Sequence, residues 1–165
     1  MFQINDYVVL GSTGVCQVVD ICKSRSEDGL DRTYYVLNPV HAQGLVINMP
    51  TDNQAIVMRR IMTRDELDEL LSLIPGIESE WIRHGNLRRS MFTEVLQSGD
   101  QKKLIWMIKT LYIRRANLEK NGKKLSSLDA EVLKSAEKML FYELALVLGI
   151  DPEEVPPFIE KQIGL

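Results

Sequence analysis

The feature that most constrains this chain is a change in the period of its hydrophobic pattern close to residue 60. Before it, short runs of β-branched and aromatic residues are separated by Gly, Pro, Asn and Ser, which is typical of short antiparallel strands. After it, apolar residues recur at intervals of three and four, as in amphipathic helices. Thr63 followed by Glu66 is a capping-box signature at this change. The sequence therefore predicts an α+β protein with a β domain over residues 1–61 and an all-α domain over residues 62–165.

The β domain is expected to be a small barrel or a strongly bent antiparallel sheet, because its strands are short and closely spaced. In the second strand the residues alternate, with the odd-numbered side chains from Val15 to Ile21 on one face. Residues 26–29, Ser-Glu-Asp-Gly, have the composition of a hairpin connection. We expect strands over residues 7–10, 15–23, 33–37, 45–49 and 55–59.

The helical domain is punctuated by clear start and stop signals. A first helix follows Thr63 and ends at Pro75-Gly76, because proline and glycine interrupt helices. Residues 78–85 could form a short helix or a loop. Asp100 and either Ser126 or Ser127 are expected N-caps, and Asp151 followed by Pro152 has the pattern of a last helix start. We expect further helices over residues 86–97, from Asp100 to Asn121-Gly122, and from Ser126 or Ser127 to Gly149.

Charge is distributed unevenly, although the net charge of the chain is only −3. Residues 81–124 carry eleven Lys or Arg side chains against three acidic ones, a net charge of +8. Residues 62–80 and 125–165 each carry −5. A basic cluster mixed with aromatic residues is what binding to nucleic-acid phosphates requires. On charge alone, a solvated helix face or pairing with the acidic helices explains the block equally well.

No catalytic motif is recognisable. His41 and His84 are the only histidines, and neither has a Cys, Asp or His at metal-binding spacing. The chain has no phosphate loop, no GxSxG and no GxGxxG. Cys16 and Cys22 lie six residues apart in one predicted strand, beyond the reach of a disulfide. We therefore expect a binding protein and not an enzyme, with no metal or other cofactor and no small-molecule substrate.

The hydropathy pattern does not suggest export or membrane insertion. No apolar run approaches the ~20 residues that span a bilayer, and the first residues do not have the pattern of a secretory signal. The expectation is a cytoplasmic protein with no membrane partner.

Nearly the whole chain carries an ordered set of residues: Asp6-Tyr7-Val8-Val9, Thr13-Gly14-Val15, Tyr34-Tyr35-Val36-Leu37, residues 45–50, Met58-Arg59, Ser98-Gly99-Asp100, Leu104, Ile108, Leu111-Tyr112, Leu125-Ser126, Ala136 and Glu143-Leu144-Ala145. This ordered set resembles the CarD family of bacterial RNA-polymerase-binding transcription regulators, which includes the CdnL-type proteins. The resemblance implies a Tudor-like N-terminal domain that binds the RNA polymerase β subunit. It also implies a helical domain that contacts promoter DNA at the upstream edge of the bubble, where a tryptophan wedges into the minor groove and stabilises the open complex.

Candidate binding residues follow from the charge pattern and from this resemblance. The nearly neutral, strand-rich β domain suits edge-strand pairing with a protein partner. A protein–protein adaptor whose basic block does not bind DNA is the alternative to a factor that bridges polymerase and fork-junction or duplex promoter DNA. Our candidates for contact with polymerase are Lys23, Arg25, Ile47, Asn48 and Met49, and those for contact with DNA are Trp81, Arg83, Arg88, Arg89, Lys109, Arg114, Lys123 and Lys124.

The two tryptophans have competing interpretations. Trp81 follows the Pro75-Gly76 break outside any apolar stripe, so we expect it to be the DNA wedge, although it could instead close the helical core. A helical wheel places Trp106 and Lys109 opposite the apolar face of their helix. A second helix packed against Trp106 explains it most simply, and a DNA contact is the alternative.

Overall fold

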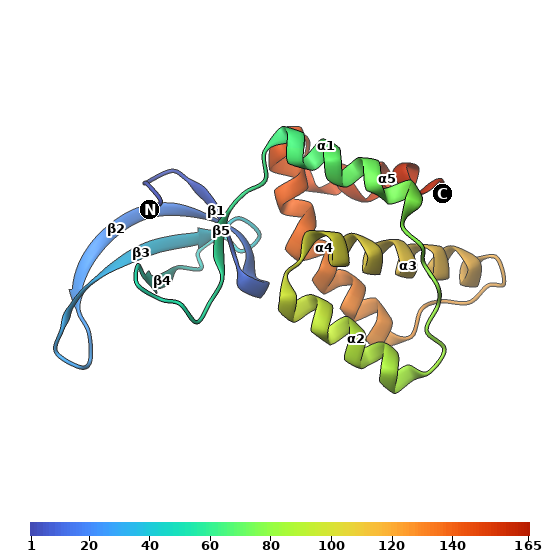
Figure 1. Cartoon of the computed structure of the whole chain (residues 1–165), viewed down its shortest axis with the longest axis horizontal. Coiled ribbons are helices and arrows are strands. Elements are labelled where there is room, and N and C mark those ends of the chain that lie inside the picture. Colours follow the sequence, from blue (N-terminus) through green and yellow to red (C-terminus); the bar gives the residue numbers. More distant parts are fainter. The chain divides into compact units, whose positions relative to one another are not determined.

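The computed structural model describes all 165 residues, which form two compact units, Met1–Ile61 and Met62–Leu165. The first unit is an antiparallel sheet and the second consists of helices, so the predicted α+β class is confirmed (Figure 1). Each unit has its own hydrophobic core.

The β unit is a five-stranded antiparallel sheet in the order β4-β3-β2-β1-β5. Strands β2 and β3 form its long central hairpin, which curves strongly in Figure 1. The fourth strand begins at Ile47 and not at Leu45, since Leu45 and Val46 are exposed loop residues. The strands are β1 (Tyr7–Leu10), β2 (Gly14–Arg25), β3 (Asp31–Pro39), β4 (Ile47–Pro50) and β5 (Met58–Arg60).

A bulge in β2 overturns the simple alternation expected for that strand. The register against β3 shifts between Val18 and Asp20. Cys16 and Val18 face the core before the bulge, whereas Ile21 packs against the same core after it. The extra residue moves the inward-facing positions from even to odd numbers, so the odd-numbered residues do not share one face. Burial also raises the pKa of the free Cys16 thiol to about 11, which makes this thiol unreactive at neutral pH.

The helical unit begins where the sequence signals predict. Thr63 and Glu66 form both hydrogen bonds of a capping box at the start of α1. Asp100 caps α3 through the backbone N–H of Lys103 at 2.9 Å, and Ser126 caps α4. Residues 78–84 are a loop. The helices are α1 (Arg64–Leu73), α2 (Gly85–Ser98), α3 (Gln101–Glu119), α4 (Ser127–Leu148) and α5 (Val155–Ile163), with 3-10 turns η1 (Gly11–Thr13), η2 (Ile74–Gly76) and η3 (Pro152–Glu154).

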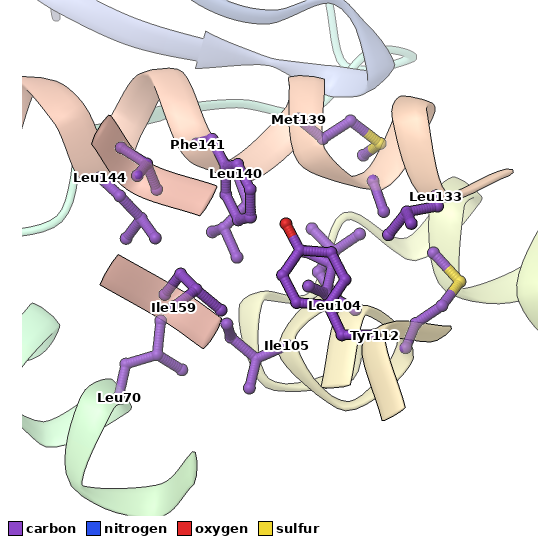
Figure 2. Packing of buried hydrophobic residues seen from close by; sticks show 14 of the residues in the cluster. Leu70, Leu104, Ile105, Tyr112, Leu133, Met139, Leu140, Phe141, Leu144 and Ile159 are labelled. Carbon is purple, nitrogen blue, oxygen red and sulfur yellow. The ribbon is translucent and has the colours of Figure 1, made fainter. Parts of the chain in front are cut away.

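The core of this unit lies between α3, α4 and their neighbours. Figure 2 shows Tyr112, Leu140 and Ile159 among the side chains that converge there. The Tyr112 hydroxyl donates to Glu137 Oε1 at 2.7 Å. Burial, and then the neighbouring Glu137 carboxylate, raise the pKa of Tyr112 above its ordinary range, so this phenol stays protonated and keeps its hydrogen bond. None of the helices has the length and apolar character that crossing a membrane requires.

Candidate nucleic-acid and polymerase interfaces

The candidate DNA-binding side chains differ sharply in exposure. Arg83, Arg89, Lys123 and Lys124 are exposed, and none of them forms an ion pair with an acidic side chain. Arg83 lies in the loop before α2 and Arg89 on α2 itself, whereas the two lysines lie between α3 and α4. Their charges are therefore available to a polyanion. We call these four residues the free cations.

Trp81 is a half-buried ring that orders two arginines. It packs against the core of the helical unit from the loop before α2. The guanidinium carbon of Arg88 lies 4.5 Å from the ring centroid, and that of Arg114 lies 5.0 Å from it. Both distances are within the range of cation–π interactions. The geometry favours the interpretation in which Trp81 closes the core and gives the arginines a platform.

Arg88 is held on its other side by an ion pair. Its Nε and one terminal nitrogen donate to the two carboxylate oxygens of Asp129 at 3.0 and 3.1 Å, and it also donates to the Ile82 carbonyl at 2.9 Å. The Arg88 and Asp129 side chains are only 16% and 11% exposed. The Ser126 hydroxyl donates to Asp129 at 2.9 Å. Arg88 therefore joins the loop, α2 and the start of α4, and its charge is already neutralised.

Lys109 is buried, contrary to its prediction as a DNA contact. The residue is 7% exposed. Its ammonium group donates to the carbonyls of Ile74 at 2.6 Å, Ile77 at 2.8 Å and Pro75 at 3.3 Å. These carbonyls lie at the end of the α1–η2 segment, where helical partners run out. The buried ammonium group supplies the hydrogen-bond donors that these carbonyls lack, and it thereby links α3 to this segment.

Replacing Lys109 by Met tests this structural role. We expect a loss of roughly 3 kcal/mol in the free energy of unfolding, because hydrogen bonds to a charged group contribute roughly 1.5–3 kcal/mol each and the stem still fills its space. Urea unfolding of the full chain, followed by tryptophan fluorescence, measures it. Lys103→Met, at an exposed position of α3, is the matched control and should change stability little. Equal losses in the two variants would contradict the role.

The structure agrees with the simpler interpretation of Trp106, in which a second helix packs against it. Its ring lies 6.0 Å from that of Phe92 in an edge-to-face arrangement between α2 and α3. A second helix is thus packed against it, as the outer-face pattern suggested. This neighbour accounts for a tryptophan on that side of α3.

The candidate polymerase contacts are only partly accessible. Lys23, Arg25 and Asn48 are exposed and Ile47 is half-buried, but Met49 is a core residue. Met49 packs with the buried residues of β2 and β3, contrary to its prediction as a polymerase contact. Ile47, two positions away on the same face of β4, also packs against this core, whereas the exposed Asn48 points to the opposite face.

The exposure of Leu45 and Val46 and the burial of Glu143 were not predicted from the sequence. Strand β4 is at one end of the sheet and pairs only with β3. The apolar residues Leu45 and Val46, just before it, are 48% and 54% exposed. Glu143 is fully buried and accepts from the backbone N–H of Met62 at 2.7 Å, at the first residue of the helical unit. The apolar residues Leu45 and Val46 are visible in the sequence beside the predicted strand. Nothing in the sequence links Glu143 to Met62.

The comparisons with known families agree with this architecture. Residues 2–62 match the family model described as the CarD-like/TRCF RID domain, and residues 69–160 match the model described as CarD, C-terminal domain. No curated protein matches the sequence. Together the two domains define an RNA polymerase-interacting transcription factor. The chain belongs to the CarD family.

Proposed function

We propose that the β unit binds the β subunit of RNA polymerase and that the helical unit contacts promoter DNA at the upstream edge of the bubble. In this role the protein stabilises the open complex, because contacts made only to melted DNA shift the equilibrium toward it. The observation that carries the DNA part is the set of four free cations in the CarD-type helical domain. The competing function is that of a protein adaptor without DNA contact. Substitutions at the same four residues distinguish the two functions.

Strand β4 and the loop before it are the proposed polymerase contact. An edge strand presents backbone groups that can pair with a strand of a partner. The exposed Asn48 lies on this strand, and Leu45 and Val46 add apolar surface next to it. Lys23 and Arg25, exposed on β2, remain further candidates.

Val46→Glu tests this contact with the full chain and the isolated polymerase β subunit. The variant should bind roughly tenfold more weakly or worse, because leaving a charge unpaired in an interface costs more than the ~1.4 kcal/mol of a tenfold change. Leu30→Glu is the matched control, since Leu30 is 60% exposed in the β2–β3 hairpin. Binding is measured by calorimetry. If Leu30→Glu weakens binding and Val46→Glu does not, the contact is not at β4.

In the proposed DNA contact, some residues of the helical unit bind phosphates at the surface and others hold these residues in position. Arg83, Arg89, Lys123 and Lys124 are proposed to contact phosphates, with Arg114 beside them on the Trp81 ring. Arg88 is proposed to position the start of α2 through Asp129 and not to contact phosphate. For Trp81 to act as a wedge, its ring would have to leave both arginines, so we propose that it acts as their platform.

A further inference from the structure

A cavity of about 500 Å³ lies between the end of α3 and the start of α4. This volume is within the range of about 300–1,000 Å³ that is usual for small-molecule sites. Leu125 and Ala130 give it an apolar surface, and Lys123 and Lys124 add positive charge. Arg115 and Glu119, one turn apart on α3, complete the wall together with Gly122.

The charges around the cavity favour an anion. Lys123 and Lys124 are exposed and unpaired, and Glu119 is the one acidic residue of the wall. Arg115 is fixed in place, because its guanidinium lies 4.4 Å from the Tyr112 ring centroid and donates to Glu160 at 3.0 Å. The cavity wall thus combines an ordered guanidinium, an apolar surface and two free ammonium groups.

We propose that this cavity binds one unstacked nucleotide. Its base lies against Leu125, Ala130 and the Arg115 plane, and its phosphate faces Lys123 and Lys124. Base faces stack on guanidinium planes and apolar side chains, and lysines neutralise the adjacent phosphate. A paired base in intact duplex remains stacked between its neighbours and does not enter such a cavity.

Two sources can supply this chemistry: a free nucleotide, or a strand of melted DNA. The second source rests on the proposed DNA contact of the helical unit, and it would make the cavity selective for the unpaired strand of a promoter bubble. The free nucleotide does not depend on that proposal. The experiment therefore includes an arm for each source.

Ala130→Leu narrows the cavity beside Leu125 without changing charge, at an exposed helical position that tolerates leucine. Ser135→Leu, also exposed on α4 but not part of the cavity wall, is the matched control. The affinities of the full-length proteins are measured for a short oligothymidylate, for its abasic analogue of equal length and charge, and for a duplex. Thymidine 5′-monophosphate is titrated separately while the NMR signals of Leu125 are followed.

The expected result is roughly tenfold tighter binding of the oligothymidylate than of its abasic analogue by the unchanged protein and by Ser135→Leu, as one stacked base would contribute. Ala130→Leu should lose this difference and keep its affinity for duplex. Equal affinity of the unchanged protein for the two single strands, or a difference that survives Ala130→Leu, overturns the nucleotide site.

The remaining outcome separates the two proposals. If no DNA of any kind binds, the proposed DNA function fails and the nucleotide arm decides alone. Shifts of the Leu125 signals with thymidine 5′-monophosphate that disappear in Ala130→Leu then sustain the site with a free nucleotide as its ligand. Unchanged signals overturn it.

Discussion

Replacing Asp129 by Ala should lower the free energy of unfolding of the helical unit by roughly 3 kcal/mol, because breaking a buried pair by removing one partner costs about 3–5 kcal/mol. The loss leaves Arg88 with its charge unpaired at 16% side-chain exposure. Both tryptophans, Trp81 and Trp106, lie in the helical unit. Their fluorescence during urea unfolding of the full chain therefore reports this unit and not the β unit.

A surface ion pair gives the matched comparison. Arg64 and Asp68 pair at 3.1 Å on α1, with side chains 59% and 55% exposed. Asp68→Ala should cost about 0.5 kcal/mol or less, since exposed i,i+4 pairs contribute little. The Arg88–Asp129 pair is expected to be the more costly of the two to break by severalfold. Equal losses would show that it does not brace the loop against α2 and α4.

Reversing two of the free cations should reduce DNA affinity severely while the fold remains intact. Four phosphate contacts would give a log–log salt slope of roughly −3.6, at about −0.9 for each contact. The double variant Arg83→Glu, Arg89→Glu should lose about half of that slope and bind roughly a hundredfold more weakly, because it both removes attraction and adds repulsion. Fluorescence anisotropy on fork-junction DNA across a salt series measures both quantities.

A control with the same kind of charge reversal separates local contact from net charge. Lys138 and Lys161 are exposed on α4 and α5, within the acidic segment 125–165. The double variant Lys138→Glu, Lys161→Glu changes the net charge by the same amount. It should leave the salt slope unchanged. A flat salt response of the unchanged protein would favour the adaptor function instead, because an adaptor makes no phosphate contact.

Local signals in the sequence specified the starts of α1, α3 and α4. A cap involves residues three positions apart, so Thr63 with Glu66 could be recognised without any knowledge of the tertiary fold. The same holds for Asp100 and Ser126. The change of hydrophobic period near residue 60 also corresponds to the end of the sheet, where β5 finishes at Arg60.

Long-range contacts could not be predicted in this way. A helical wheel gives Lys109 an outward direction, but the carbonyls it binds come from a segment some 32 to 35 residues earlier. Arg88 and Asp129 are separated by 41 residues. Charge patterning counts all of these side chains as available, and only the packed structure shows which of them are already neutralised. The bulge in β2 could not be predicted either, because it is defined by the register of β2 against β3.

For Trp81, the sequence predicted the loop position and left two interpretations open, a DNA wedge or closure of the helical core. The residue lies in a loop after the Pro75-Gly76 break, as expected. Its ring packs against the core and carries Arg88 and Arg114. An aromatic residue outside a periodic stripe gave no indication of these partners, because they come from α2 and α3.

The lifetime of the open complex of RNA polymerase on a promoter fragment tests the central proposal most directly. The protein should lengthen this lifetime after a heparin challenge, and two variants should each abolish the effect. Val46→Glu should abolish it because the variant no longer binds the polymerase. The double variant Arg83→Glu, Arg89→Glu should abolish it because it no longer binds DNA, although it still binds the β subunit. A full effect with the second variant, or no effect of the unchanged protein, would contradict the proposal that the helical unit holds melted promoter DNA.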